Sequence, residues 1–420
     1  MQTAQTLPER VRRRGLAVIL AATFLSWGGF FVVVPLISVH FVDGLGWTAA
    51  SVGLILAVRQ FTQQGTSSLT GVLADRFGPK PLICIGLLIR IAGFLLLAWA
   101  GSYLMVMCSA LLMAIGGGFF ESPQAAATAA LTTPEDRQRF FSLSAVVGGL
   151  GVSLGTQLGA LLLGVNFAVV SLAGAAAFAI IFMCMLIFFP HISVSSGPDN
   201  AWQGLAKALK DRTFVRFNVT LMGYWFLWTQ FSISLPLAAT AIAGNTSAVA
   251  WMYAVNSGVT VLLGYFLPRM LEKRMASLPM LLIGIVLMGA GFYSIAFVDS
   301  LVLMLVSVFV ISIGMVLTRP SQQTIVAGLA NPNALGAFLG AASLSLAIGG
   351  GIGNYAGGAI YDMGQHTGMT WLPWVIFGTI GIATALLLTR MRGRLEHREQ
   401  HLVRVARPEP APHAQPVSQL

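Results

Sequence analysis

Four charged residues lie inside long apolar stretches of this chain, namely Arg59, Arg90, Glu121 and Arg319. A charge in an apolar environment is costly, and within a membrane it usually marks a functional site. Glu121 is the carboxylate that lies well inside such a stretch. It is therefore the candidate either to carry a proton or to form a fixed ion pair with an arginine.

The positions of two of these charges are related. Glu121 and Arg319 differ in number by 198, which is also the spacing of the internal repeat described below. Each stands within two residues of a proline, Pro123 or Pro320, where a helix can bend. We predict that the two charges lie at the same depth and pair in one conformation of the molecule. The alternative is that both side chains extend to the membrane surface.

The residue patterns of common enzymes are missing from the sequence. It contains no H-E-x-x-H, no G-x-S-x-G and no phosphate-binding P-loop. The six histidines fall in tails, in loops or at the ends of apolar stretches. We therefore expect no enzyme, no cofactor and no metal site. The three cysteines, all in apolar stretches, are interpreted as small buried side chains rather than as a disulfide framework.

Composition indicates that membrane helices position these residues. The chain is 56% hydrophobic and 9% charged, whereas soluble domains carry roughly 25% charged residues. A helix of about 20 residues spans the roughly 30 Å of a bilayer's hydrocarbon core. The sequence predicts an all-α membrane protein with twelve spans. They lie near 16–38, 50–72, 81–100, 103–131, 140–164, 166–189, 214–240, 248–268, 278–297, 300–329, 335–361 and 372–390.

The distribution of basic residues predicts the orientation of these spans. Of the 24 lysines and arginines, 21 fall in the tails and in connections on one side, none falls on the other side, and three lie within spans. By the positive-inside rule the basic side is cytoplasmic, with both termini inside. The net charge of +10 is thus a topology signal for the plasma (inner) membrane, not a sign of nucleic-acid binding.

An internal repeat divides the chain into two six-helix halves. A shift of 198 superposes glycines and prolines over roughly 80 residues, including the stripes Gly151, Gly155, Gly159 and Gly349, Gly353, Gly357. Glycines at i, i+4 and i+8 give a helix face that another helix can approach closely; sliding and static packing are both open. The predicted domains are a cytoplasmic tail (1–15), a first half (16–189), a cytoplasmic linker with an interfacial helix (190–213), a second half (214–391) and a disordered basic tail (392–420).

One charged turn carries a family resemblance. The run Gly71-Val-Leu-Ala-Asp75-Arg76-Phe-Gly78-Pro-Lys80 resembles the loop between the second and third helices of major facilitator transporters. The alternative is a basic hairpin with two turn glycines. Further stretches, among them Arg59-Gln60-Phe61 and Trp251-Met-Tyr-Ala254, resemble the drug:proton antiporter group of that superfamily.

The resemblance implies a secondary transporter that works by alternating access, with protons as the coupling ion and a small lipophilic or amphipathic molecule as substrate. It implies a gate in which Asp75 meets the start of the eleventh span, a structural role for Arg90, and proton coupling or an ion pair at Glu121, Arg319 and Arg59. We expect a monomer in the lipid bilayer. A carrier of another metabolite and a receptor without transport remain alternatives. The expected substrate cavity contains Trp27, Phe30, Phe31, Gln60, Tyr224, Trp228, Gln230 and Asn256.

The sequence also departs from the pattern of drug exporters. The fifth span lacks their Gly-Pro pair, and the fourth lacks their arginine. Arg319 and Asn256 stand where the resemblance leads us to expect acids. These departures bear on proton coupling and not on the fold.

Overall fold

The computed structural model describes residues 8–132, 134–190, 192, 208–272, 274–329 and 335–393. Nearly all of these residues lie in helices, and no strand occurs among them. The predicted all-α fold class is therefore confirmed. The linker and its interfacial helix lie outside the described residues except for 190, 192 and 208–213.

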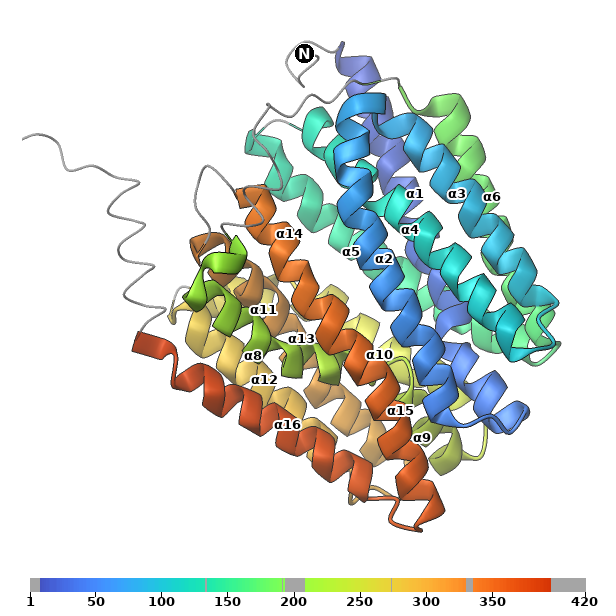
Figure 1. Cartoon of the computed structure of the whole chain (residues 1–420), viewed down its shortest axis with the longest axis vertical. Helices are drawn as coiled ribbons and strands as arrows, with labels where there is room; N and C mark the ends of the chain where they lie inside the picture. Colours follow the sequence, from blue (N-terminus) through green and yellow to red (C-terminus); the bar gives the residue numbers. More distant parts are fainter. Residues whose placement is uncertain are drawn as a thin grey trace, which may run out of the picture.

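The helices form two bundles that follow each other along the chain (Figure 1). The first bundle contains α1 (Glu9–Ser38), the π-helical turn η1 (Val39–Gly44), α2 (Ala49–Phe77), α3 (Pro79–Ala98), α4 (Tyr103–Leu131), α5 (Pro134–Leu163) and α6 (Phe167–Phe188). The second contains α8 (Arg212–Thr229), α9 (Ser234–Ala243), α10 (Ser247–Leu263), α11 (Phe266–Glu272), α12 (Ser277–Ile295), α13 (Leu301–Leu329), α14 (Leu335–Ser345), η3 (Leu346–Gly350), α15 (Gly351–His366) and α16 (Leu372–Thr389).

Not every predicted span passes a test of length and composition. Within the described ranges, nine helical segments are long and apolar enough to cross a membrane, or ten if α10 and α11, bent by 48°, count as one span. Helix α2 is not among these segments. It is long enough, but Arg59, Gln60, Gln63 and Gln64 near its middle make it too polar for the test. Twelve spans thus remain a prediction.

The repeat in the sequence is a repeat in the structure. Helices α4 and α13 begin at Tyr103 and Leu301 and end at Leu131 and Leu329, 198 residues apart at both ends. The tight contact between α3 and α4 also recurs between α12 and α13. A Cβ added at Gly86 would lie 2.7 Å from the Gly116 carbonyl oxygen, and one added at Gly284 would lie 2.8 Å from that of Gly314. Both contacts need a glycine because the two backbones touch.

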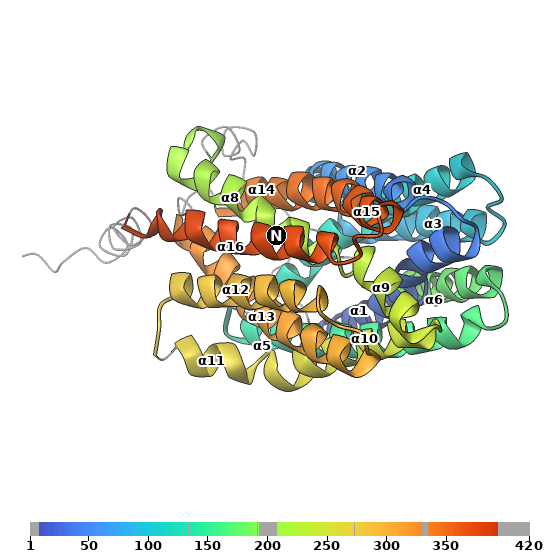
Figure 2. The ribbon, with the colours of Figure 1, turned by 90° about the horizontal axis from the view of Figure 1, so that it is seen from below.

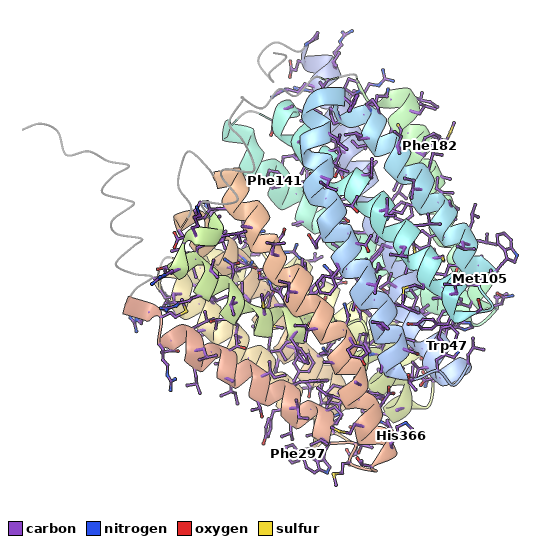
Figure 3. All side chains as sticks on the ribbon, viewed as in Figure 1. Trp47, Met105, Phe141, Phe182, Phe297 and His366 are labelled. Carbon is purple, nitrogen blue, oxygen red and sulfur yellow. The ribbon has the colours of Figure 1, made fainter. Side chains whose placement is uncertain are left out.

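The bundles contact each other mainly at one end of the molecule. We call the end that holds the start of α1 and the last turn of α16 the terminal end, and the opposite end, with Trp47, Phe297 and His366, the far end (Figure 3). Helix α2 packs along α15 but hardly touches α14, and α5 packs beside α10. Figure 2 shows both pairs side by side. The bundles are therefore closed at the far end and diverge toward the terminal end.

The cysteines follow the prediction only in part. Cys84, Cys108 and Cys184 are free thiols, but Cys84 and Cys184 are only partly buried and Cys108 is exposed on α4. An outer helix face of a membrane protein meets lipid, so an apolar sequence alone does not place a side chain in the protein interior.

Candidate functional site

Three of the four intramembrane charges meet in the first bundle. The Arg59 guanidinium donates through Nη1 to Gln63 Oε1 at 2.8 Å, and Gln63 Nε2 donates to Glu121 Oε1 at 2.8 Å. Arg90 Nη2 lies 3.8 Å from the same carboxylate oxygen. We call Arg59, Gln63, Arg90 and Glu121 the N-half cluster. It joins α2, α3 and α4 through their side chains.

The local sequence explains how these side chains reach one another. Arg59 and Gln63 are four residues apart, so they share one face of α2. The close α3–α4 approach at the paired glycines brings Arg90 against α4. A Cβ added at Gly117 would lie 3.3 Å from Arg90 Nη2 and 3.2 Å from the Gln63 side chain. Glycine at this position therefore leaves room for the guanidinium and the amide.

Aromatic rings enclose the arginines of the cluster. The centre of the Arg59 guanidinium lies 5.1 Å from the Phe30 ring, and that of Arg90 lies 5.5 Å from the same ring and 4.8 Å from Phe178. These distances fit cation–π contacts. Phe30, predicted to line the substrate cavity, therefore flanks both arginines of the cluster.

Glu121 pairs with Arg90 in this conformation and not with Arg319. Among the described residues no ion pair joins Glu121 to Arg319, and Arg319 is exposed on α13. Sequence reasoning assigned Arg90 a structural role and missed it as the partner. The available signal was charge balance, because a cation inside α3 needs a nearby anion and Glu121 is the carboxylate within that half's spans. The Glu121–Arg319 pair stays a prediction for another conformation.

An aromatic row connects the two bundles. Trp27 lies 5.9 Å from Phe31, Phe31 lies 5.6 Å from Tyr253 of α10, and Tyr253 lies 5.9 Å from Phe231, all between ring centres. Trp27 is 40% exposed, so it presents an open aromatic surface. Of the predicted cavity residues, Phe31 is thus placed where the two halves meet, and Trp27 lies beside it.

Other predicted cavity residues are buried in this conformation. Gln230 is fully buried between α8 and α9, where its amide donates to the carbonyls of Phe226 and Gly353 at 2.9 Å each and accepts from Ser234 at 2.8 Å. It satisfies backbone groups at the break in the helix and is not available to a substrate here. Tyr224 and Gln60 are buried as well.

The last two predicted cavity residues are partly buried. Asn256 donates to Ser312 Oγ at 3.0 Å, so its amide already has a partner on α13. Trp228 packs its ring edge-on against Trp225, with 5.8 Å between ring centres.

Both glycine stripes pack against the first helix of their own half. A Cβ at Gly155 would meet the carbonyl oxygen of Gly28 on α1. A Cβ at Gly353 would lie 2.7 Å from the Cα of Phe226 on α8. One turn away, Gly151 and Gly159 meet the α1 backbone in the same way and Gly349 meets the backbone of Met222, whereas Gly357 meets the side chain of Gln230. The stripes thus place helix backbones in contact within each half.

The charged turn is described in part. Gly78 ends α2 with a φ of +78°, a conformation that favours glycine. The Lys80 ammonium donates to the Leu186 and Phe189 carbonyls at 3.0 and 2.7 Å, so it caps the end of α6. The side chains of Asp75 and Arg76 and the surroundings of Gly71 lie outside what the structure describes, and the gate role of this turn stays a prediction.

The comparison with protein families decides the family. The profile of the Major Facilitator Superfamily matches residues 19–354 and 220–415. The chain belongs to the major facilitator superfamily. Members of this superfamily are membrane transporters, so this chain is a multi-pass transporter of small molecules and not an enzyme.

Curated relatives in this superfamily share about two-fifths of the sequence. The multidrug resistance protein MdtH of Aeromonas hydrophila is 40% identical over 399 residues, covering 94% of this chain and 99% of the relative. The MdtH proteins of Photorhabdus laumondii and of Yersinia pestis are 36% and 37% identical, over 92% and 90% of this chain and 96% and 94% of the relatives.

Solved structures of the superfamily share the fold. A POT family transporter in complex with 5-aminolevulinic acid matches with a TM-score of 0.77 and 14% identity, over 91% of this chain and 96% of that one. The nucleoside transporter NupG matches with a TM-score of 0.74 and 18% identity, over 91% and 99%. At these identities the likeness concerns the fold alone.

Proposed function

We propose that this transporter works by alternating access and exports small lipophilic or amphipathic molecules in exchange for protons across the inner membrane. The observation that carries the proposal is the unequal contact between the halves. Hydrogen bonds that join them gather toward the far end, where Ser38 donates to the Ser232 carbonyl, Gln157 to the Ala250 carbonyl and Thr240 to Asp43. A transporter with the other end closed would need only a different packing of the same halves.

One far-end contact has a proposed counterpart at the terminal end. Asp362, near the end of α15, accepts from the backbone N–H groups of Ala49 and Ala50 at 2.8 and 2.7 Å, at the start of α2. A helix N-terminus carries partial positive charge and favours a carboxylate. Asp75, near the other end of α2, would make the equivalent contact with the start of α14 when the terminal end closes. The two segments run antiparallel, so each would supply the carboxylate for the other's N-terminus.

The direction and the coupling ion follow from charge. The basic residues at the terminal end make that end cytoplasmic by the positive-inside rule, so the described conformation is open toward the cytoplasm. Glu121 lies ten residues from the end of α4, about 15 Å at the helical rise of ~1.5 Å per residue. Its side chain is 48% exposed. A half-exposed carboxylate at this depth is suited to receive a proton, which would release its pairing with Arg90.

The relatives' names supply the substrate class of the proposal. The MdtH proteins are called multidrug resistance proteins, and the exposed Trp27 with the aromatic row suits bulky lipophilic compounds. The carrier of another small metabolite is the alternative within the same fold. A receptor on this fold would bind a ligand without moving it.

Transport into inverted membrane vesicles tests the proposal. We expect fluorescent lipophilic compounds to accumulate in vesicles that carry the protein when the interior is acid, and accumulation to collapse when a protonophore removes the pH gradient. Glu121→Gln should abolish the dependence on the gradient. Ligand binding without any flux would instead support the receptor, and flux of one metabolite without a response to drugs would support the alternative carrier.

A further inference from the structure

The N-half cluster holds one more positive than negative charge. Arg90 is buried in the first bundle and Arg59 is partly buried, with its Nε atom enclosed. Among the side chains that the structure describes, Glu121 is the one carboxylate that acts on them. The other acidic side chains of this half that the structure describes, Glu9 and Asp43, lie at helix ends. A net charge in a low-dielectric interior is strongly unfavourable unless a counter-charge accompanies it.

The same two arginines have hydrogen-bond donors without acceptors. Arg59 Nε, Arg90 Nε and Arg90 Nη1 are buried and have no partner in the described part of the chain. Arg90 as a whole is only 2% exposed. Buried polar atoms are nearly always satisfied by protein, water or an ion. The rings of Phe30 and Phe178 attract the guanidinium groups, but a ring carries no net negative charge to balance them.

We propose that Arg59 and Arg90 form a binding site for one monovalent anion, either a small inorganic anion such as chloride or the carboxylate of an amphipathic substrate. A single negative charge restores neutrality to the cluster and supplies an acceptor for the free guanidinium N–H groups. A cationic ligand would add to the existing surplus. In this proposal the anion would reach the arginines beside Glu121, whose side chain is 48% exposed.

The aromatic row extends the site for a carboxylate that belongs to a substrate. Phe30 contacts both arginines, its ring lies 5.6 Å from Phe31, and Phe31 lies 5.9 Å from the exposed Trp27. An aryl carboxylate would thus place its charge on the arginines and its ring along this row. Binding of a substrate carboxylate rests on the proposed function, whereas binding of an inorganic anion does not.

Charge variants separate anion binding from a purely structural role, because they move the net charge in opposite directions. Glu121→Gln raises the cluster from one surplus positive charge to two, while Arg59→Gln or Arg90→Gln makes it neutral. We expect Glu121→Gln to bind the anion at least tenfold more tightly and either arginine variant to lose binding. An arrangement that only supports packing would be weakened by all three changes without any dependence on the anion.

The experiment uses the full-length protein purified in detergent, without membrane or gradient, so failure of transport leaves it interpretable. The thermal unfolding midpoint is followed as sodium chloride replaces sodium isethionate, a bulkier sulfonate, at constant ionic strength. A ligand that binds the folded state raises this midpoint in a saturable manner. Arg390→Gln, which removes an exposed cation at the end of α16, is the matched control and should respond as the wild type does.

A second titration distinguishes the two sources of the anion. We expect 1-naphthoate to compete with chloride and the uncharged 1-naphthamide to have no effect if a substrate carboxylate occupies the site. Competition by chloride alone assigns the site to an inorganic anion. If neither anion shifts the midpoint of the wild type or of Glu121→Gln, the proposal is wrong. Should Arg90→Gln fail to fold, Arg59→Gln and the wild-type titrations decide.

Discussion

At the scale of single residues, hydrogen bonds determine what the intramembrane charges can do. Gln63 is 9% exposed and uses both ends of its amide, since Oε1 accepts from Arg59 and Nε2 donates to Glu121. It therefore transmits the position of one charge to the other. A proton on Glu121 would change what this amide and Arg90 can bind, which links the proposed proton site to the arginines.

Replacing Gln63 tests this link. Leucine is close in size to glutamine, but Gln63→Leu removes the hydrogen bonds that the amide makes with Arg59 Nη1 and Glu121 Oε1. Such a loss typically costs about 1–3 kcal/mol, so we expect a lower thermal unfolding midpoint. Gln323→Leu, on the exposed face of α13, is the control and should change little. Equal midpoints for the two variants would show that the amide does not hold the cluster.

At the scale of elements, contacts between backbones fix the helices within each half. The α1–α5 and α8–α15 contacts rely on glycines because no side chain fits between the backbones. The pairs are equivalent under the internal repeat, so the two halves are stabilised in the same way. In the proposed alternating access, we therefore expect whole halves to move more than the helices within each half.

A glycine pair tests this packing. Gly155→Ala would force a methyl group against the Gly28 carbonyl, and overpacking of this kind costs about 1–3 kcal/mol. Gly258→Ala, where a Cβ meets nothing within 4 Å, should be neutral or slightly stabilising because alanine favours helix. Thermal unfolding in detergent measures both. A similar midpoint for both variants would contradict the close approach of α1 and α5.

The carboxylate contacts at the two ends should shift the conformational equilibrium in opposite directions. Spin labels at Leu45 and Met369, both exposed at the far end, report the separation of the halves there. Asp362→Asn weakens the contact with the start of α2, so the measured distances should lengthen. Asp75→Asn weakens the proposed terminal-end contact, so they should shorten and transport should fall.

Asp299 provides the control for this measurement. It is exposed between α12 and α13, and Asp299→Asn should leave the distances unchanged. A shift in the same direction for Asp75→Asn and Asp362→Asn would contradict the two-ended arrangement.

At the scale of the whole molecule, charge distribution and packing agree on one orientation. The end at which the halves diverge is also the end that holds the basic residues of the helix connections. In the proposed orientation that end faces the cytoplasm, and the transporter would take its substrate from there. This orientation holds only if the chain crosses the membrane twelve times and the loops alternate between its two sides.

Accessibility labelling tests the topology. In a variant without Cys84, Cys108 and Cys184, single cysteines at Gly44 and at Ser196 are treated with a membrane-impermeant maleimide in intact cells. We expect Gly44→Cys to react from outside and Ser196→Cys only after the membrane is opened. Reaction of both from the same side would contradict twelve spans with cytoplasmic termini.

The sequence by itself determined the helical fold, the repeat and the candidate charges. Apolar length and repeated glycines are local properties of the chain, so the matching limits of α4 and α13 followed from residue spacing alone. Tertiary structure decided the partners. Arg90 rather than Arg319 meets Glu121, and Gln230 is enclosed at a helix break, because such contacts depend on the rotation and approach of helices distant in sequence. The closed far end is likewise a property of packing, since it depends on contacts between helices of different halves such as α2 and α15.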